Sequence, residues 1–119
     1  MEKVGVNITM NNIVSFPYNQ TGVARLDSNG IIHNHIYHEC PVGSVDENKI
    51  IYNNTSPIGR VDEYGIIHDH PTNNSPIGRV DNNGYIHNHP TENSLVARVD
   101  GDNQLAAGGA YLLLLNEIR

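Results

Sequence analysis

The sequence predicts an all-β chain of six short β-hairpin repeats arranged around a pseudo-symmetry axis, with a buried apolar C-terminal segment at the centre. Three observations predict this fold: a hairpin motif, its regular spacing along the chain, and one continuously apolar run at residues 105–115. Short hairpins with thin hydrophobic faces are unstable alone, so the repeats must share a common centre or stack. A chain of 119 residues can bury a single core, and we therefore expect one β-hairpin-repeat domain over residues 1–119.

The hairpin motif is clearest at residues 77–89, where apolar and polar residues alternate on both sides of the turn sequence Asp-Asn-Asn-Gly. This alternation is typical of two half-buried strands. Asp81 can accept hydrogen bonds from the backbone ahead of it, and Gly84 can adopt the positive φ that ends a type I turn with a bulge. The turn sets the register so that Val80 lies opposite Ile86 on the core face. The opposite, polar face carries Arg79, Asp81, Tyr85, His87 and His89.

Six units share a small residue that is followed, eight positions later, by an aliphatic residue. The small residues are Gly5, Ala24, Gly43, Gly59, Gly78 and Ala97, and the aliphatic residues are Ile13, Ile32, Ile51, Ile67, Ile86 and Leu105. The units begin near residues 4, 23, 42, 58, 77 and 96. The first unit has Ile8 where the others have Asp, and the third has Lys49 in place of the turn Gly. One shorter step divides the units into two sets of three, so a closed ring and a two-layer sandwich both stay open.

The C-terminal run at residues 105–115 must be buried on all sides or lie in a membrane. It is far shorter than the roughly 20 residues that span a bilayer, so we expect it inside the ring of hairpins. The spacing of the units places a strand near Leu105, whereas the block of four Leu residues has high helix propensity. A strand and a short helix therefore both remain open, and Gly108 and Gly109 would allow close backbone approach in either case.

Repeats of the form apolar-Gly-x-Val-Asp-x-x-Gly-x-Ile, followed by a Gly-Gly-Ala and Leu block, resemble the bacterial beta-flower proteins. In that family short hairpins are arranged as petals around a pseudo-symmetry axis. The resemblance covers residues 4–115. It implies the fold and no activity, because the family is largely uncharacterised.

Charge and composition restrict the function. The formal net charge of −6 argues against a nucleic-acid partner. The N-terminus has no apolar stretch typical of a signal peptide, which predicts a cytoplasmic protein without a membrane segment. A single cysteine, Cys40, excludes an internal disulfide framework. We expect a small structural or interaction module rather than an enzyme, with no catalytic or cofactor-binding residue assigned; a homo-oligomer is compatible with the repeats, and the sequence names no protein partner.

The sequence His-x-His occurs three times and provides the alternative hypothesis, a divalent-metal-binding protein. Residues two apart on a strand point to the same side, so each pair can offer two imidazoles to one ion such as zinc or nickel. The second unit adds another His and the Cys. The candidate metal ligands are His33, His35, His38, Cys40, His68, His70, His87 and His89. The spacing His33-x-His35-x-x-x-Glu39 also resembles the metal-binding core of a cupin, which gives a small cupin-like metalloenzyme as a weaker version of this hypothesis.

The competing interpretation is that these residues are polar decoration of the repeat. The predicted register places an Arg opposite the first His of each pair, and a guanidinium repels a metal cation. The Asp residues of the turns lie diagonally and could offset this charge. If the His faces point inward, six imidazoles line one cavity; if they point outward, the pairs stay apart.

Overall fold

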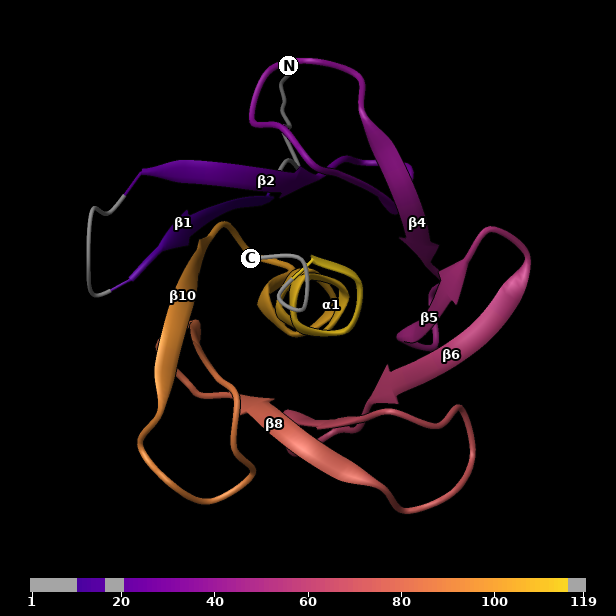
Figure 1. The fold of residues 1–119 in the computed structure, drawn as a ribbon, viewed down its shortest axis with the longest axis vertical. Coiled ribbons are helices and arrows are strands. Elements are labelled where there is room, and N and C mark those ends of the chain that lie inside the picture. Colours follow the sequence, from indigo (N-terminus) through magenta and orange to yellow (C-terminus); the bar gives the residue numbers. More distant parts are fainter. Residues whose placement is uncertain (1–10, 17–20, 116–119) are drawn as a thin grey trace, which may run out of the picture.

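The computed structural model describes residues 11–16 and 21–115, and these form a closed antiparallel barrel of ten strands around a helix (Figure 1). The strands are β1 (Asn11–Ser15), β2 (Gly22–Leu26), β3 (Ile31–His33), β4 (Pro41–Val45), β5 (Ile50–Asn53), β6 (Ser56–Val61), β7 (Ile66–His68), β8 (Pro76–Val80), β9 (Tyr85–His87) and β10 (Leu95–Asp100). Around the barrel each strand pairs with its neighbours in the chain, and β1 pairs with β10. The predicted all-β class is therefore confirmed, and the arrangement is a closed ring rather than a two-layer sandwich.

Tight hairpins form in the second to fifth predicted units. In the hairpin of β8 and β9, Val80 lies opposite Ile86 and Arg79 lies opposite His87. Gly84 has a φ of 84°, and its N–H donates to the carbonyl oxygen of Asp81 at 3.0 Å. The third unit reaches the same turn without glycine, since Lys49 itself adopts a φ of 64°. The predicted turn and register are both confirmed.

The strands pair into five units, which we call blades. Blade 1 is β2–β3, blade 2 is β4–β5, blade 3 is β6–β7, blade 4 is β8–β9, and blade 5 is β10–β1. Blade 5 is composite because its two strands come from opposite ends of the chain. Ile13 lies opposite Val99 there, in the same way that Ile86 lies opposite Val80 in blade 4.

The described residues thus supply five blades where the sequence predicts six hairpins. The first predicted unit contributes its second strand, β1; its small residue, Gly5, lies outside the described residues. The sixth unit contributes its first strand, β10, whereas Leu105 lies in a helix. The physical reason is that β1 already occupies the edge of β10, so the apolar run that follows is buried along the barrel axis.

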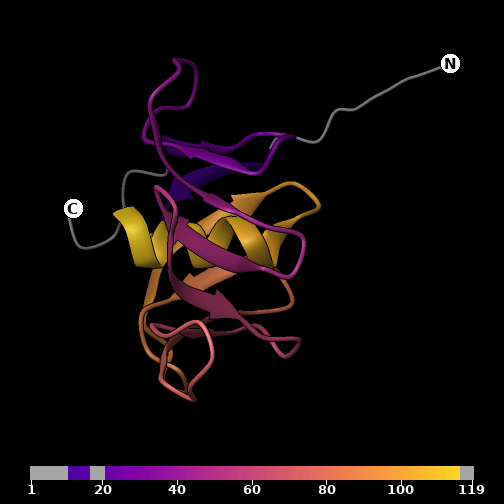
Figure 2. The same ribbon diagram turned by 90° about the vertical axis from the view of Figure 1, so that its right-hand side faces the viewer.

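This run forms α1 (Gln104–Ala110), which continues directly into a π-helical turn, η1 (Tyr111–Leu115). Figure 2 shows from the side that the helix runs through the ring of strands. Both glycines of α1 approach a blade closely: a Cβ on Gly108 would lie 2.3 Å from Cγ2 of Val80, and one on Gly109 would lie 2.1 Å from Cγ2 of Val61. The expected burial at the centre is confirmed, with a helix rather than a strand. No helix in the described part of the chain is long and apolar enough to span a membrane.

Consecutive leucines of η1 reach consecutive blades. A Cβ on Gly78 would lie 2.4 Å from Leu112, one on Gly59 would lie 2.6 Å from Leu113, and one on Gly43 would lie 2.6 Å from Leu114. Five blades are spaced about 72° apart, whereas an α-helix turns by about 100° per residue. A π-helical turn is wider and rotates less per residue, so it fits one leucine to each of blades 4, 3 and 2. The glycines leave the space that these leucines fill.

Candidate functional site

Three long loops extend outward from the ring, and we call them the tip loops (Figure 1). They comprise residues 34–40, 69–75 and 88–94, and each follows the first His of a His-x-His pair. The strands β3, β7 and β9 end at that first His, so the second His already lies in the loop. The expectation that both imidazoles of a pair face one side required a strand through both residues, and it does not hold here.

The first His of each pair is buried and hydrogen-bonded to the Asp of the turn, and in blades 1 and 3 it also binds the tip loop. His33, His68 and His87 are each 2% exposed. Their Nε2 atoms lie 2.8, 3.0 and 3.0 Å from the Oδ2 atoms of the turn residues Asp27, Asp62 and Asp81, respectively. In blades 1 and 3 the Nδ1 atom accepts a backbone N–H from the last residue of the tip loop, at 3.1 Å and 3.0 Å. An imidazole that accepts at Nδ1 carries its proton at Nε2, so these two rings are neutral donors to the carboxylate.

The second His of each pair caps the tip loop from within. In blade 3, Nδ1 of His70 accepts the backbone N–H groups of Thr72 and Asn73, at 3.1 Å and 2.8 Å. The other two pairs repeat this arrangement through His35 and His89. A side-chain acceptor that satisfies backbone donors two and three positions ahead fixes a turn, as Asn and Asp commonly do. The His therefore determines the local conformation of the loop.

The Arg on the neighbouring strand holds the carbonyl groups of the same loop. Arg60 donates from Nη1 to the carbonyl oxygens of His70 and Asn73, at 3.0 Å and 2.8 Å. Arg79 does the same in blade 4, and Arg25 donates to three carbonyl oxygens and to the carboxylate of Glu39 in blade 1. The predicted cross-strand pairing of these arginines with the first His is confirmed. The loop is thus tied through both its N–H and its C=O groups.

The turn aspartates are the anionic centres of this network. Their Oδ1 atoms accept two backbone N–H groups of the turn at 2.9 to 3.1 Å, while Oδ2 accepts from the His ring. Partial burial alone would raise the pKa of Asp27, Asp62 and Asp81, but the hydrogen bonds from the His ring and from the backbone outweigh it and hold each pKa below the ordinary value of 3.8. From the sequence, these aspartates were predicted only to lie diagonally from the His, and their hydrogen bond to its ring was not predicted. We call the repeated set of Arg, Asp and two His residues the loop-holding network.

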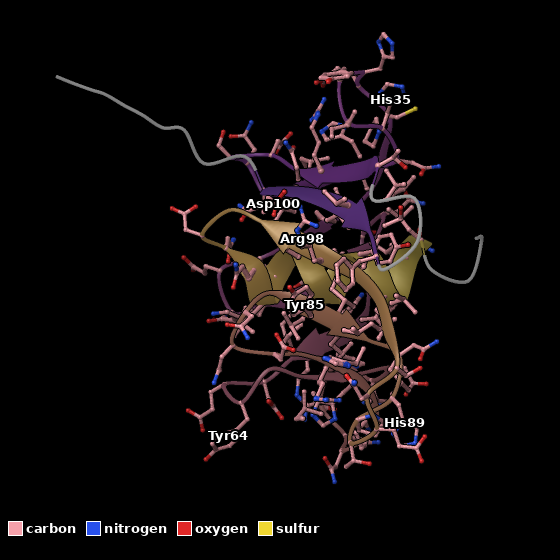
Figure 3. The ribbon with its side chains drawn as sticks, turned by 90° about the vertical axis from the view of Figure 1, so that its left-hand side faces the viewer. His35, Tyr64, Tyr85, His89, Arg98 and Asp100 are labelled. Carbon is pink, nitrogen blue, oxygen red and sulfur yellow. The ribbon has the colours of Figure 1, made fainter. Side chains whose placement is uncertain are left out.

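Blades 2 and 5 depart from this network. In blade 2 the hydroxyl of Tyr52 donates to Oδ2 of Asp46 at 2.9 Å, in place of the His, and this hydrogen bond raises the pKa of Tyr52. A signal for this role was present in the sequence, because Tyr52 follows Ile51 as His68 follows Ile67. In blade 5, Arg98 instead pairs with Asp100 of its own strand at 3.1 Å (Figure 3). The complete network therefore belongs to the three blades that carry tip loops.

The predicted metal ligands are only partly brought together. The His pairs lie on three different blades, and the barrel interior between them is filled by α1 and the aliphatic core. The rings of His35 and His38 do meet, with centroids 4.3 Å apart, and Cys40 is exposed. Within residues 11–16 and 21–115, no three His, Cys, Asp or Glu side chains are grouped so that they could hold a metal ion. Metal binding by these residues stays a prediction.

No family model, curated protein or solved structure matches the chain. A His hydrogen-bonded to an Asp is the pairing that orients a catalytic base. In His33 and His68, however, both ring nitrogens are engaged within the protein and the rings are almost fully buried, so neither can take a proton from a bound substrate.

Among the described residues, two large hydrophobic side chains are exposed. Tyr37, in the first tip loop, and Tyr64, in the turn of blade 3, are each 81% exposed. Figure 3 shows Tyr64 at the opposite end of the molecule from His35, which is in the same loop as Tyr37. Two exposed aromatic residues are therefore held at distant points of one scaffold.

Proposed function

We propose that the chain is a structural or interaction module in which a ring of blades holds tip loops in fixed positions for contact with a protein partner. One observation carries this proposal: in three blades an Arg, an Asp and two His residues take corresponding roles in holding the turn and the tip loop. A loop that is ordered before binding loses less conformational entropy on binding. Such pre-ordering favours a loop that serves as a binding surface.

Differences between the tip loops support the same proposal. The second and third loops read His-Pro-Thr-Asn-Asn-Ser and His-Pro-Thr-Glu-Asn-Ser, whereas the first reads His-Ile-Tyr-His-Glu-Cys. The holding residues are retained while the exposed residues change. Tyr is enriched among the residues that dominate protein interfaces, and Tyr37 is nearly fully exposed. We infer that the first tip loop is the principal contact surface.

We also propose that the chain belongs with the bacterial beta-flower proteins that its repeats resemble. Blades around an axis with an apolar segment at the centre support that assignment. The described residues provide five blades, one fewer than the six hairpins that the repeats predict.

The test is photo-crosslinking from position 37 in the full chain, followed by measurement of Kd for the purified captured protein. Tyr37→Ala is expected to weaken binding by about 30-fold, the effect of losing an interface residue worth about 2 kcal/mol. Tyr64→Ala is the matched control, because Tyr64 is equally exposed at the other end of the molecule. Equal losses in both variants, or the absence of saturable binding, would contradict the proposal.

A divalent metal ion at the first tip loop is the second candidate, favoured by the contact between the rings of His35 and His38. Imidazole and thiolate both bind zinc and nickel, and Cys40 follows in the same loop. Elemental analysis of tag-free, chelator-free protein, then melting with and without each metal, tests this candidate. Stoichiometric metal that is lost in His38→Asn supports this candidate. The absence of both bound metal and a change in Tm rejects it.

A further inference from the structure

In the composite blade, β1 has two neighbouring strands but is directly connected along the chain to only one of them. β1 forms four pairs of opposing residues with β10 and four with β2. A short connection links it to β2, whereas β10 lies at the other end of the chain. In structural terms, β2 and β10 form the two walls of a groove, and β1 fills that groove.

The groove is shaped for this particular strand. Ile13 is 0% exposed and lies opposite both Val99 and Ala24. Asn11 is 1% exposed, and its Oδ1 accepts the backbone N–H of Asn103 at 2.8 Å. A Cβ on Gly101 would lie 2.2 Å from that same Oδ1 atom, so the connection from β10 to α1 leaves room for Asn11 only because residue 101 is glycine. An apolar socket for Ile13 and a polar socket for Asn11 together define which strand fits and in which register.

The link between β1 and β2 is short. The N–H of Ser15 donates to the carbonyl oxygen of Thr21 at 3.0 Å, so residues 16–20 alone connect this opposed pair. Pro17 lies in this link, and a residue that precedes proline favours an extended conformation over a helical one. Exchange of one identical element between two copies recreates every native contact and changes only the link.

We propose that the groove between β2 and β10 binds β1 of a second copy of the chain, in the register now occupied by its own β1. Two copies then exchange their first strands and form a dimer with two complete composite blades. The same Ile13 and Asn11 sockets hold the strand, and the balance between monomer and dimer is set by protein concentration and by the link at residues 16–20.

Shortening the link tests this directly. Deletion of residues 17–20 leaves Phe16 alone between Ser15 and Thr21, fewer than the two residues of the tightest common hairpin loop. β1 can then no longer fill the groove of its own chain. We expect the molar mass from light scattering to double, while Tm stays close to that of the wild-type chain. Insertion of Gly-Ser-Gly-Ser after Asn19 lengthens the link and serves as the opposite control. This variant should have the mass of a monomer at every concentration.

A second variant identifies the contact responsible. Ile13→Asp, added to the deletion, places a carboxylate in the apolar socket and should abolish the dimer. Three results would overturn the proposal: a folded monomer from the deletion, an unfolded monomer from the deletion, or a dimer that survives Ile13→Asp. The first would show that the groove needs no strand, the second that it accepts none from another copy, and the third that a different surface mediates association.

Discussion

Nε2 of His68 lies 3.0 Å from Oδ2 of Asp62, and Nδ1 of the same ring accepts the backbone N–H of Ser75 at 3.0 Å. The ring therefore connects the turn at one end of blade 3 with the last residue of its tip loop at the other. Blade 1 repeats both hydrogen bonds. The stability of the hairpin and the conformation of the loop are coupled through one buried side chain.

Replacing Asp62 with Asn is expected to destabilise the fold by about 1–3 kcal/mol, the usual cost of leaving a buried polar group unsatisfied. The amide can still accept at Oδ1 from the turn, but its NH₂ group then faces the protonated Nε2 of His68, which places two donors together. Urea denaturation measures the loss. Asp102→Asn removes the same charge at an exposed position and should be neutral; a comparable loss there would show that net charge, rather than the hydrogen bond, is responsible.

The depressed aspartate pKa values predict acid sensitivity. Because the folded pKa of Asp27, Asp62 and Asp81 lies below 3.8, their contribution to stability is complete above the unfolded value and is lost as pH falls through the folded value. The urea concentration at the midpoint of unfolding should therefore decrease as the pH falls below about 4, where model carboxylates titrate. The difference between wild type and the triple Asp→Asn variant should shrink over the same range, and a difference that stays constant would refute this assignment.

Removal of the His70 side chain should loosen one loop with little effect on the barrel. In His70→Ala the N–H groups of Thr72 and Asn73 lose their acceptor, so their hydrogen exchange should accelerate while core amides keep their protection. The amides of Thr91 and Glu92 in the third tip loop provide an internal control, since His89 still caps them. Faster exchange throughout the chain would mean that the cap supports the whole fold.

Gly109→Ala tests the contact between the helix and the barrel. Alanine favours a helix over glycine by about 1 kcal/mol, yet the new methyl group would lie 2.1 Å from Cγ2 of Val61. Overpacking typically costs about 1–3 kcal/mol, so a net loss of stability is expected in thermal denaturation. Val61→Ala in the same chain should restore part of it, and this non-additivity distinguishes a steric clash from an effect on the helix itself.

The sequence predicted the local features of each hairpin better than the way in which the barrel closes. The turn of Asp81 and Gly84 and its register depend on residues within one hairpin, and both were predicted. The pairing of Ile13 with Val99 depends on residues at opposite ends of the chain, and the repeat pattern assigned each to a hairpin of its own. At Leu105 the repeat predicted a strand and the leucine block a helix; the occupied edge of β10, which no local pattern encodes, decided between them.

The roles of the histidines were predicted least well. His68 and His70 look equivalent when a strand is assumed to run through both, but β7 ends at His68. One ring is then buried against an Asp and the other caps a loop. The exact position at which a strand ends depends on hydrogen bonds with Arg60 and with the returning loop, and these are visible only in three dimensions.

The pairing of the first described strand with the last has a consequence for synthesis on the ribosome. The side chain of Asn11 accepts from the backbone of Asn103, 92 residues further along the chain, and the helix that fills the barrel is made later still. While the chain is emerging, the inward faces of the finished blades, including Ile32 and Ile51, lack the helix that completes their buried core. Chains dominated by contacts between distant residues fold slowly and expose apolar surface until folding is complete. The nascent chain is therefore expected to need protection until its last helix has left the exit tunnel.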